Sequence, residues 1–301
     1  MSVFKSYFKA MASRCEICLA AADPQEAQTL AQMAIDEVLR IEAKYSRYRP
    51  DSVLSGINAQ AGLDWVLCDD ETLGLLDYAG SLFEASGGLF DVTSGVLRRS
   101  WHAQQTLLPT PEALRETCAL VDWTSVQRRG RHVRLPRLGM ELDFGGFGKE
   151  YAADLAAGVL LAQGVHHGYV NLAGDIRVMG PRPDGQAWSI GIKDPQHPER
   201  LVASLALAEG GVATSGDYER YVELDSRRYS HILDPHSGMP AAYWRSASVM
   251  APTALEAGAL ATIALLKQEQ ALAFLQGQGV PYLLVDQSGV LHGNPRDHAP
   301  A

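Results

Sequence analysis

The chain has 301 residues, of which 47% are apolar and 20% charged, and its formal net charge is −9 at pH 7. This composition is typical of a soluble globular protein that buries a core, arranged as one large domain or two modest ones. Nucleic-acid-binding proteins usually carry a basic surplus, so the acidic balance argues against that class. No segment approaches the roughly 18 apolar residues of a membrane-spanning helix.

The N-terminal segment suggests a location and contains a first candidate motif. MSVFKSYFKAMASRC has no apolar region of the length that a signal peptide needs, so we expect a cytoplasmic protein. Cys15 and Cys18 form a lone C-x-x-C without a second pair of ligands. Residues i and i+3 of a strand point to opposite faces. We therefore interpret the two cysteines as small apolar residues of a strand and not as a metal or redox site.

Several segments have the apolar spacing of helices. Residues 24–46 follow Asp23, which is a suitable N-cap. Residues 70–88 form a second predicted helix, capped by Asp69 or Asp70 and ended by two glycines. Further helices are predicted over residues 110–120, 151–164 and 252–279.

Strand-like segments fill the second half of the chain, at residues 131–145, 168–180, 187–195, 201–216, 227–238 and 281–293. Helices and strands are interspersed but do not form regular βαβ units, so the predicted fold class is α+β (mixed α/β). We expect a single domain over residues 1–301, either undivided or built from two subdomains that meet near residues 140–170 with the ligand between them.

The stretch ELDFGGFGKEYAAD, residues 141–154, predicts a strand, a turn with three glycines and a helix. Its spacing matches neither the P-loop nor the G-x-G-x-x-G motif. Two interpretations stay open from this stretch alone. A tight turn between two elements explains the glycines without any ligand. Alternatively, backbone N–H groups at the helix start face an anion, and Lys149 adds positive charge.

A second candidate region is GDYERYVELDSRRYSHILDPHSGMP, residues 216–240, which is dense in polar and turn residues. His231 lies in a strand-like stretch, and Asp234 and Pro235 begin a turn that ends at Gly238. A lone histidine in such a place is more often structural. Beside acidic residues, however, it is able to act as a general base near neutral pH.

Seven ordered blocks together resemble the ApbE family, the FAD:protein FMN transferases, over nearly the whole chain. FDVTSGVL is similar to the family's F-D-x-T-x-G-x-L, and ELDFGGFGKEYAAD is similar to L-D-L-G-G-I-A-K-G-Y-A-V-D. The other blocks are SRYRPDSVLSGIN, VNLAGDIRVMG, GIKDP, the pair VATSGDYERY and RRYSHILDPHSGMP, and SVMAPTALEAGALAT. Seven blocks in order are far more specific than any one of them.

The resemblance implies an ApbE-like fold and an activity. Members bind FAD, cleave its pyrophosphate with Mg²⁺ and transfer FMN to a Ser or Thr hydroxyl of a target protein, releasing AMP. The target is commonly a flavin-carrying subunit of an electron-transfer complex. The chemistry is physically reasonable, because a divalent cation neutralises pyrophosphate charge and a base must deprotonate the acceptor hydroxyl.

The resemblance also assigns site residues. His231 matches the residue expected to act as the catalytic base. The carbonyl of Gly146 and the side chain of Thr262 match the metal ligands. The residues that match FAD contacts are Met11, Tyr48, Leu89, Phe90, Asp91, Asp143, Lys149, Ile232 and Ala261.

The chain departs from the family pattern at two positions that bear on the site. The family has A-D-A-L-A-T where this chain has Ala257-Gly258-Ala259-Leu260-Ala261-Thr262, so the aspartate four residues before Thr262 is a glycine. Lys149 is followed by Glu150 instead of Gly, which places negative charge near the predicted phosphate turn. A third, milder departure is Ala12 in place of Gly.

The missing aspartate leaves several hypotheses open. The protein retains FAD but not catalysis, or it recruits a carboxylate such as Asp175 or Asp217, or it holds the metal through phosphates and waters. An FAD-binding member without transferase activity and a Mg²⁺-dependent FAD pyrophosphatase are therefore the alternatives to the transferase. If the metal site has merely lost a ligand, Gly258→Asp should strengthen it.

Overall fold

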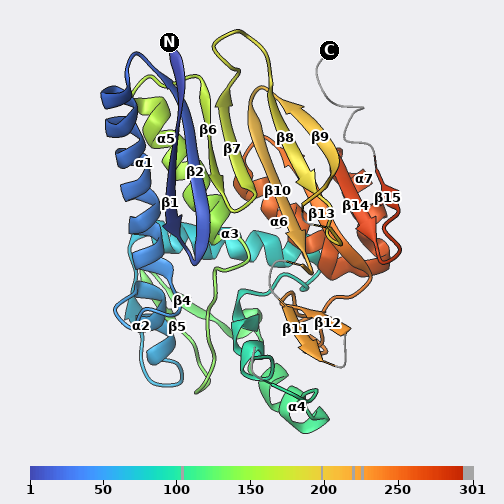
Figure 1. Ribbon diagram of the computed structural model, residues 1–301. Helices are drawn as coiled ribbons and strands as arrows, with labels where there is room; N and C mark the ends of the chain where they lie inside the picture. The colour runs from blue at the N-terminus through green and yellow to red at the C-terminus, as the bar shows by residue number, and fades with distance from the viewer. Residues whose placement is uncertain (103–104, 198, 219–220, 225–226, 294–301) are drawn as a thin grey trace.

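The computed structural model describes residues 1–102, 105–197, 199–218, 221–224 and 227–293. Its centre is an eight-stranded sheet in which all neighbouring strands are antiparallel (Figure 1). The hairpin β1–β2 forms one edge and β14–β15 the other, so both ends of the chain contribute to one sheet. In spatial order the strands are β1 (Ser2–Ala10), β2 (Ser13–Ala21), β6 (Gly168–Leu172), β7 (Asp175–Gly180), β10 (Gly210–Gly216), β13 (Trp244–Ala251), β14 (Tyr282–Asp286) and β15 (Leu291–His292).

Helices cover one face of this sheet. α1 packs on β1 and β2, α5 on β6 and β7, and α6 on β10 and β13. The helices are α1 (Pro24–Tyr45), α2 (Val53–Ala59), α3 (Asp70–Ser86), α4 (Pro111–Cys118), α5 (Gly148–Ala162), α6 (Ala254–Lys267) and α7 (Ala271–Gln278), with the 3₁₀ helices η1 (Val92–Arg99), η2 (Trp123–Ser125) and η3 (Gln268–Gln270). Among the described residues, no helix is both long enough and apolar enough to cross a membrane.

The opposite face of the sheet is covered by the hairpin of β8 (Trp188–Lys193) and β9 (Leu201–Leu207). The side chains of Trp188 and Ile190 are buried there against Val178 and Met250 of the main sheet. Two small sheets lie outside this layered body: β3 (Val66–Leu67), β5 (His132–Arg134) and β4 (Gln127–Arg129) form one, and β11 (Tyr221–Leu224) with β12 (Arg227–Ser230) forms the other.

The predicted helices begin where their caps place them. Asp23 accepts hydrogen bonds from the N–H groups of Gln25 and Glu26 at 2.9 Å each, which satisfies donors that the first turn of α1 leaves unpaired. Asp69 caps α3 in the same way by accepting from the N–H of Thr72 at 3.0 Å. The mixed α+β class and these helix starts are therefore confirmed.

The expected strand over residues 131–145 is wrong beyond β5. Residues 135–144 form no strand, because the chain turns at residues 137–139 and the backbone after this turn pairs with one asparagine side chain and one backbone carbonyl instead of a strand. The side-chain amide of Asn58 donates to the carbonyl of Leu142 at 2.9 Å, and the Asn58 carbonyl oxygen accepts from the N–H of Leu142 at 2.7 Å. The N–H of Asp143 donates to the carbonyl of Val92 at 2.8 Å. The segment before the glycine turn is thus held by Asn58 of α2 and Val92 of η1.

The C-x-x-C pair has the arrangement expected for strand residues. Cys15 and Cys18 are both buried in β2, Cys15 in the core under the helices and Cys18 in the core under β8 and β9. Both thiols are free, and burial raises their pKa values. The two side chains therefore serve opposite faces of the sheet, as predicted.

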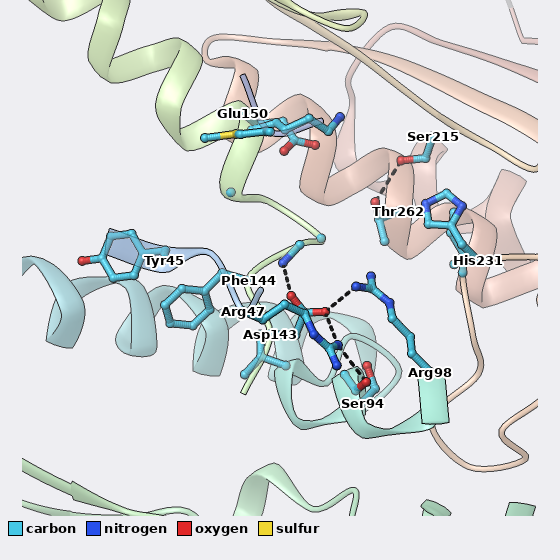
Figure 2. A pocket seen from close by; sticks show the side chains of 18 of the residues that line it. Tyr45, Arg47, Ser94, Arg98, Asp143, Phe144, Glu150, Ser215, His231 and Thr262 are labelled. Atoms are coloured by element: carbon cyan, nitrogen blue, oxygen red, sulfur yellow. Dashed lines mark hydrogen bonds and ion pairs between the residues drawn. The ribbon is translucent and has the colours of Figure 1, made fainter. Parts of the chain in front are cut away.

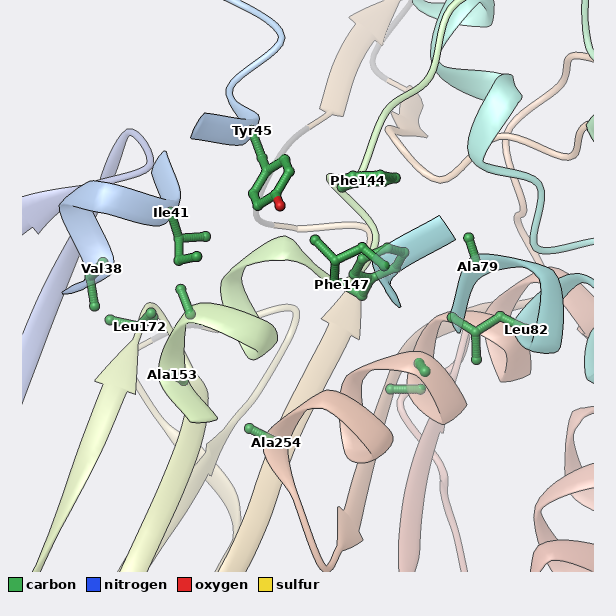
Figure 3. Close-up of a cluster of buried hydrophobic side chains, with 14 of the residues drawn as sticks. Val38, Ile41, Tyr45, Ala79, Leu82, Phe144, Phe147, Ala153, Leu172 and Ala254 are labelled. Carbon is green, nitrogen blue, oxygen red and sulfur yellow. The ribbon is translucent and has the colours of Figure 1, made fainter. Parts of the chain in front are cut away.

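Aromatic packing fixes the segment that enters α5. The ring of Phe144 lies 5.6 Å from that of Tyr45 and 5.2 Å from that of Phe147. The ring of Phe147 also lies 5.4 Å from that of Tyr78 of α3, and Figure 3 shows Phe147 within the buried cluster. Because Phe144 and Phe147 flank the glycine turn and are both buried, the turn between them has a rigid base.

Candidate active site

A cavity of about 690 Å³ opens where α1, the segment before η1, the glycine turn and α6 meet (Figure 2). This volume is within the range of small-molecule sites. All but one of the residues assigned from the sequence line it: Met11, Tyr48, Leu89, Phe90, Asp91, Asp143, Gly146, Lys149, His231, Ile232 and Thr262. Ala261 is the exception, because its side chain is fully buried in the apolar core. Part of the VATSGDYERY block, residues 219–220, lies outside the described residues.

Asp143 is the centre of an ion-pair cluster at one end of the cavity. Its Oδ2 lies 3.1 Å from Nη1 of Arg47 and 2.8 Å from Nη1 of Arg98, and its Oδ1 accepts from the N–H of Gly145 at 2.8 Å. Burial alone would raise the pKa of Asp143, but the two guanidinium groups outweigh it and hold the pKa below its usual value. Both carboxylate oxygens are satisfied, so the position of Asp143 is well determined.

Arg47 and Arg98 line the cavity but were not among the residues assigned from the sequence. Arg47 lies within the SRYRPDSVLSGIN block, and Arg98 follows directly after FDVTSGVL. Their position in or next to a matched block was the feature of the sequence that could have identified them as site residues. The Arg98 side chain is 32% exposed and remains accessible from the cavity. Two guanidinium groups at a cavity wall suit the recognition of phosphate oxygens.

The glycine turn leaves the start of α5 open to the cavity. The N-cap of α5 is Phe147, which provides no side-chain hydrogen bond to the helix. The N–H of Gly148 donates to the carbonyl of Phe144 at 2.7 Å, so the partial positive charge of the helix N-terminus is left to the N–H groups that follow it. A Cβ at Gly148 would meet nothing within 4 Å, whereas a Cβ at Gly146 would lie 2.8 Å from the ring of Phe90. Neither glycine has a positive φ, so the turn conformation does not require them. Close packing against Phe90 explains Gly146, and Gly148 leaves the backbone accessible.

The opposite end of the cavity contains two buried carboxylates. Lys149 forms a close ion pair with Asp175 of β7. Glu150 is 5% exposed, and its Oε2 has no hydrogen-bond partner in the part of the chain that the structure describes. Burial, together with the negative charge of Asp175, raises the pKa of Glu150 to about 8. This end is therefore incompletely satisfied, in contrast to the surroundings of Asp143.

Thr262 and His231 lie near this end, on elements from the C-terminal half. The hydroxyl of Thr262, on α6, lies 2.9 Å from that of Ser215 on β10. Figure 2 shows His231 next to Thr262, with both side chains at the cavity wall. The residue after His231 is fixed at both backbone groups: the Ile232 N–H donates to Ser230 Oγ at 3.1 Å, and its carbonyl accepts from the Ala241 N–H at 2.9 Å.

Asp91 has a structural task as well as a place in the cavity wall. Its Oδ1 accepts from the N–H of Thr93 at 2.7 Å and from the Thr93 hydroxyl at 2.6 Å, and its Oδ2 accepts from the N–H of Trp123 at 3.1 Å. Both oxygens therefore have protein partners. A ligand contact by Asp91 stays a prediction, as do the other contacts assigned by resemblance.

The turn between β1 and β2 forms part of the rim. Met11 and Ala12 have φ values of 51° and 57°, a left-handed conformation that is uncommon for residues other than glycine. The N–H of Met11 donates to Oε1 of Glu42 at 2.7 Å, which ties the turn to α1. Tyr48, at another part of the rim, is 75% exposed and presents its ring to the solvent side of the cavity.

The acidic side chains do not form a ready-made metal cage. Within the described ranges, no group of three or more His, Cys, Asp or Glu side chains is arranged to hold a metal ion. Of the two carboxylates considered as substitutes at position 258, Asp175 lines the cavity but is paired with Lys149, and Asp217 is not among the lining residues. A cation here would depend on isolated side-chain oxygens, backbone carbonyls and oxygens of a ligand.

The antiparallel sheet, its helical layer and this cavity define a ligand-binding α+β protein. Residues 11–284 match the model of the ApbE family, so the chain belongs to that family. It is 33% identical over 267 residues to the FAD:protein FMN transferase of Treponema pallidum, covering 81% of this chain and 74% of the relative. It is 30% identical over 271 residues to that of Vibrio cholerae, covering 88% and 80%.

Solved structures show the same architecture. The ApbE protein of Thermotoga maritima has a TM-score of 0.90 at 29% identity, with 97% of each chain covered. The Pseudomonas stutzeri flavinyl transferase ApbE has a TM-score of 0.86 at 27% identity, with 99% of this chain and 96% of that chain covered. The fold expected from the resemblance is thus confirmed.

Proposed function

We propose that the chain is an FAD:protein FMN transferase, which binds FAD in the cavity and transfers FMN to a Ser or Thr hydroxyl of a target protein. The observation that carries this proposal is the convergence of residues from five separate sequence blocks on one cavity of suitable size. The curated relatives named above carry the same activity in their names. The resemblance found in the sequence therefore has a spatial counterpart.

The charged walls of the cavity suit a dinucleotide with two linked phosphates. Arg98 and the open N-terminus of α5 present positive charge toward the space between them, and Gly148 leaves room for close approach of a phosphate to the backbone. The apolar residues Leu89, Phe90 and Ile232 give the remaining surface that flat rings require. FAD is accordingly the proposed substrate.

The reaction needs a base and a route for the leaving group. We assign the base to His231, which takes the proton of the acceptor hydroxyl as its oxygen bonds to the phosphorus of the FMN half. The bond between that phosphorus and the bridging oxygen breaks, and AMP leaves with the oxygen and its electron pair. The products are a phosphodiester between FMN and the target protein, AMP and one proton.

Mg²⁺ is part of the proposal, and the residues present fit it. Gly146 and Thr262 line the cavity, and a backbone carbonyl and a hydroxyl are oxygen donors of the kind that this hard cation prefers. When bound, the cation would offset the negative charge that develops on the pyrophosphate oxygens. The protein groups would hold the cation and orient the substrate, while His231 moves the proton.

The partner and the location are less specific. We propose a protein acceptor with an exposed Ser or Thr, of which a subunit of an electron-transfer complex is one candidate. The cytoplasmic location stays a prediction, and separate assay of cytoplasmic, periplasmic and membrane fractions with an antibody to the chain would test it.

The proposal is tested by incubating the purified protein with FAD, Mg²⁺ and an acceptor domain, followed by mass spectrometry and AMP detection. We expect an FMN-sized mass gain on the acceptor and an equal amount of AMP, and no gain on an acceptor whose target Ser or Thr is Ala. Free FMN and AMP without a modified acceptor would instead identify a pyrophosphatase. Intact FAD with every acceptor tried would identify a binding protein.

A further inference from the structure

Glu150 has an unusual environment for a carboxylate. It is the third residue of α5, lines the cavity and is almost completely buried, yet its Oε2 has no hydrogen-bond partner among the described residues. Buried polar groups are nearly always hydrogen-bonded, and an unpaired buried carboxylate costs several kcal/mol in principle. A buried carboxyl group without a partner in the described part of the chain, on a residue of the cavity wall, therefore indicates a ligand with positive charge.

Gly258 explains how the Glu150 side chain fits. Gly258 lies inside α6 and is buried, where glycine costs up to about 1 kcal/mol relative to alanine. A Cβ at Gly258 would lie 2.5 Å from Cγ and 2.7 Å from Cδ of Glu150, closer than real Cβ atoms approach a neighbour. The side chain of Glu150 thus occupies the space in which any side chain at 258 would begin.

Other residues of the cavity wall carry oxygen donors. Thr262 is four residues after Gly258 on α6, so both lie on one face of the helix, and its hydroxyl lines the cavity. Gly146 lines the same cavity, and its backbone carbonyl is a further oxygen donor there in the proposal. Lys149 is engaged by Asp175, which leaves two buried carboxylates with one ammonium group. A carboxyl group, a hydroxyl and a carbonyl are the oxygen ligands that a hard divalent cation takes.

We propose that Glu150 is the carboxylate ligand of the divalent cation in this chain, reaching from α5 into the space that an aspartate side chain at position 258 would fill from α6. The two departures of the sequence then form one exchange: the family pattern has Gly at 150 and Asp at 258, and this chain has Glu150 and Gly258. The inference rests on the proposed function, which supplies the need for the cation. It replaces the expectation that Gly258→Asp alone would strengthen the metal site, since that side chain would collide with Glu150.

Binding of Mn²⁺, followed by the loss of the free-ion electron paramagnetic resonance signal, tests the assignment without any turnover. The titration is made with Mn²⁺ alone and again with ADP, which supplies a pyrophosphate but no flavin. We expect Glu150→Gln to weaken Mn²⁺ binding by about tenfold or more in the condition in which the wild type binds. The exchange variant Glu150→Gly/Gly258→Asp should restore binding to within about threefold of the wild type.

Glu256→Gln is the matched control, because Glu256 is an exposed carboxylate of α6 that does not line the cavity. It should bind Mn²⁺ as the wild type does. Circular dichroism melts of every variant establish that it is folded. Wild-type affinity in folded Glu150→Gln, or no Mn²⁺ binding by the wild type in either condition, would overturn the assignment. Glu150-dependent Mn²⁺ binding without any FMN transfer would instead remove the proposed function and leave the ligand assignment standing.

Discussion

The two ends of the cavity contain buried carboxylates in opposite states. Asp143 has a partner for each oxygen, and its pKa lies below the usual value because Arg47 and Arg98 outweigh burial. Glu150 has an oxygen without a partner among the described residues, and burial together with the negative charge of Asp175 raises its pKa. The Asp143 end is therefore a preorganised part of the cavity wall, whereas the Glu150 end is a site that a ligand would complete. We therefore expect mutations at the Asp143 end to affect stability and mutations at the other end to affect chemistry and metal binding.

The largest expected effect tests the reactive end. His231→Ala should lower FMN transfer by about 10²- to 10⁴-fold, because the acceptor hydroxyl loses its base, while FAD affinity stays nearly unchanged. His236→Ala is the matched control, since His236 is exposed in the same turn and does not line the cavity. AMP release measures the transfer rate of each variant, and flavin fluorescence measures its FAD affinity. An unchanged rate would remove His231 from the mechanism.

Asp143→Asn addresses the preorganised end. The amide cannot neutralise Arg47 and Arg98, so the free energy of unfolding should fall by about 2–3 kcal/mol, discounted from values for fully buried pairs because Arg98 is partly exposed. Chemical denaturation measures the loss. Asp51→Asn is a suitable control, because its ion pair with Arg49 is at the surface and should matter little. Equal stability of Asp143→Asn and the wild type would show that the cluster is not structural.

The same variant predicts a pH dependence. The pKa of Asp143 is lower in the folded protein than its ordinary value of 3.8, so its carboxylate stabilises the fold above that value. This contribution is lost as the pH falls below 3.8 and through the folded pKa. The difference in unfolding free energy between wild type and Asp143→Asn should therefore be constant near neutral pH and shrink in acid. A difference that grows toward acid pH would contradict the ion-pair account.

Gly258→Ala tests the contact at the incomplete end. In the wild type the added Cβ meets Glu150, and overpacking should cost about 1–3 kcal/mol. In a Glu150→Ala background the clash is gone, so the same substitution should stabilise α6 by up to about 1 kcal/mol. Gly158→Ala is the control, because a Cβ there meets nothing within 4 Å and should stabilise α5 in both backgrounds. If Gly258→Ala changes the free energy of unfolding in the same direction in both backgrounds, Glu150 does not occupy the space next to position 258.

The sequence predicted more of the fold and of the cavity lining than of the chemistry at the Glu150 end of the cavity. Capping residues such as Asp23 and Asp69 act locally, so their helices were predictable from neighbouring residues. The segment before the glycine turn was not, because its backbone partners are Asn58 and Val92, far away in the sequence. Glu150 and Gly258 each appeared as a separate departure. Only the three-dimensional contact shows that one side chain fills the space left by the other.

The smallest effect concerns the rim of the cavity, where Met11 and Ala12 share a left-handed turn. A side chain costs about 1–2 kcal/mol in this conformation, whereas glycine costs about 0.4–1 kcal/mol in unfolded-state entropy. Ala12→Gly should therefore raise the free energy of unfolding by up to about 1 kcal/mol and leave FAD affinity unchanged. Met11→Gly relieves the same strain but also removes a side chain, so FAD affinity should fall. If both variants bind FAD as the wild type does, Met11 supports the turn and not the ligand, and the rim belongs with Asp143 to the structural part of the cavity.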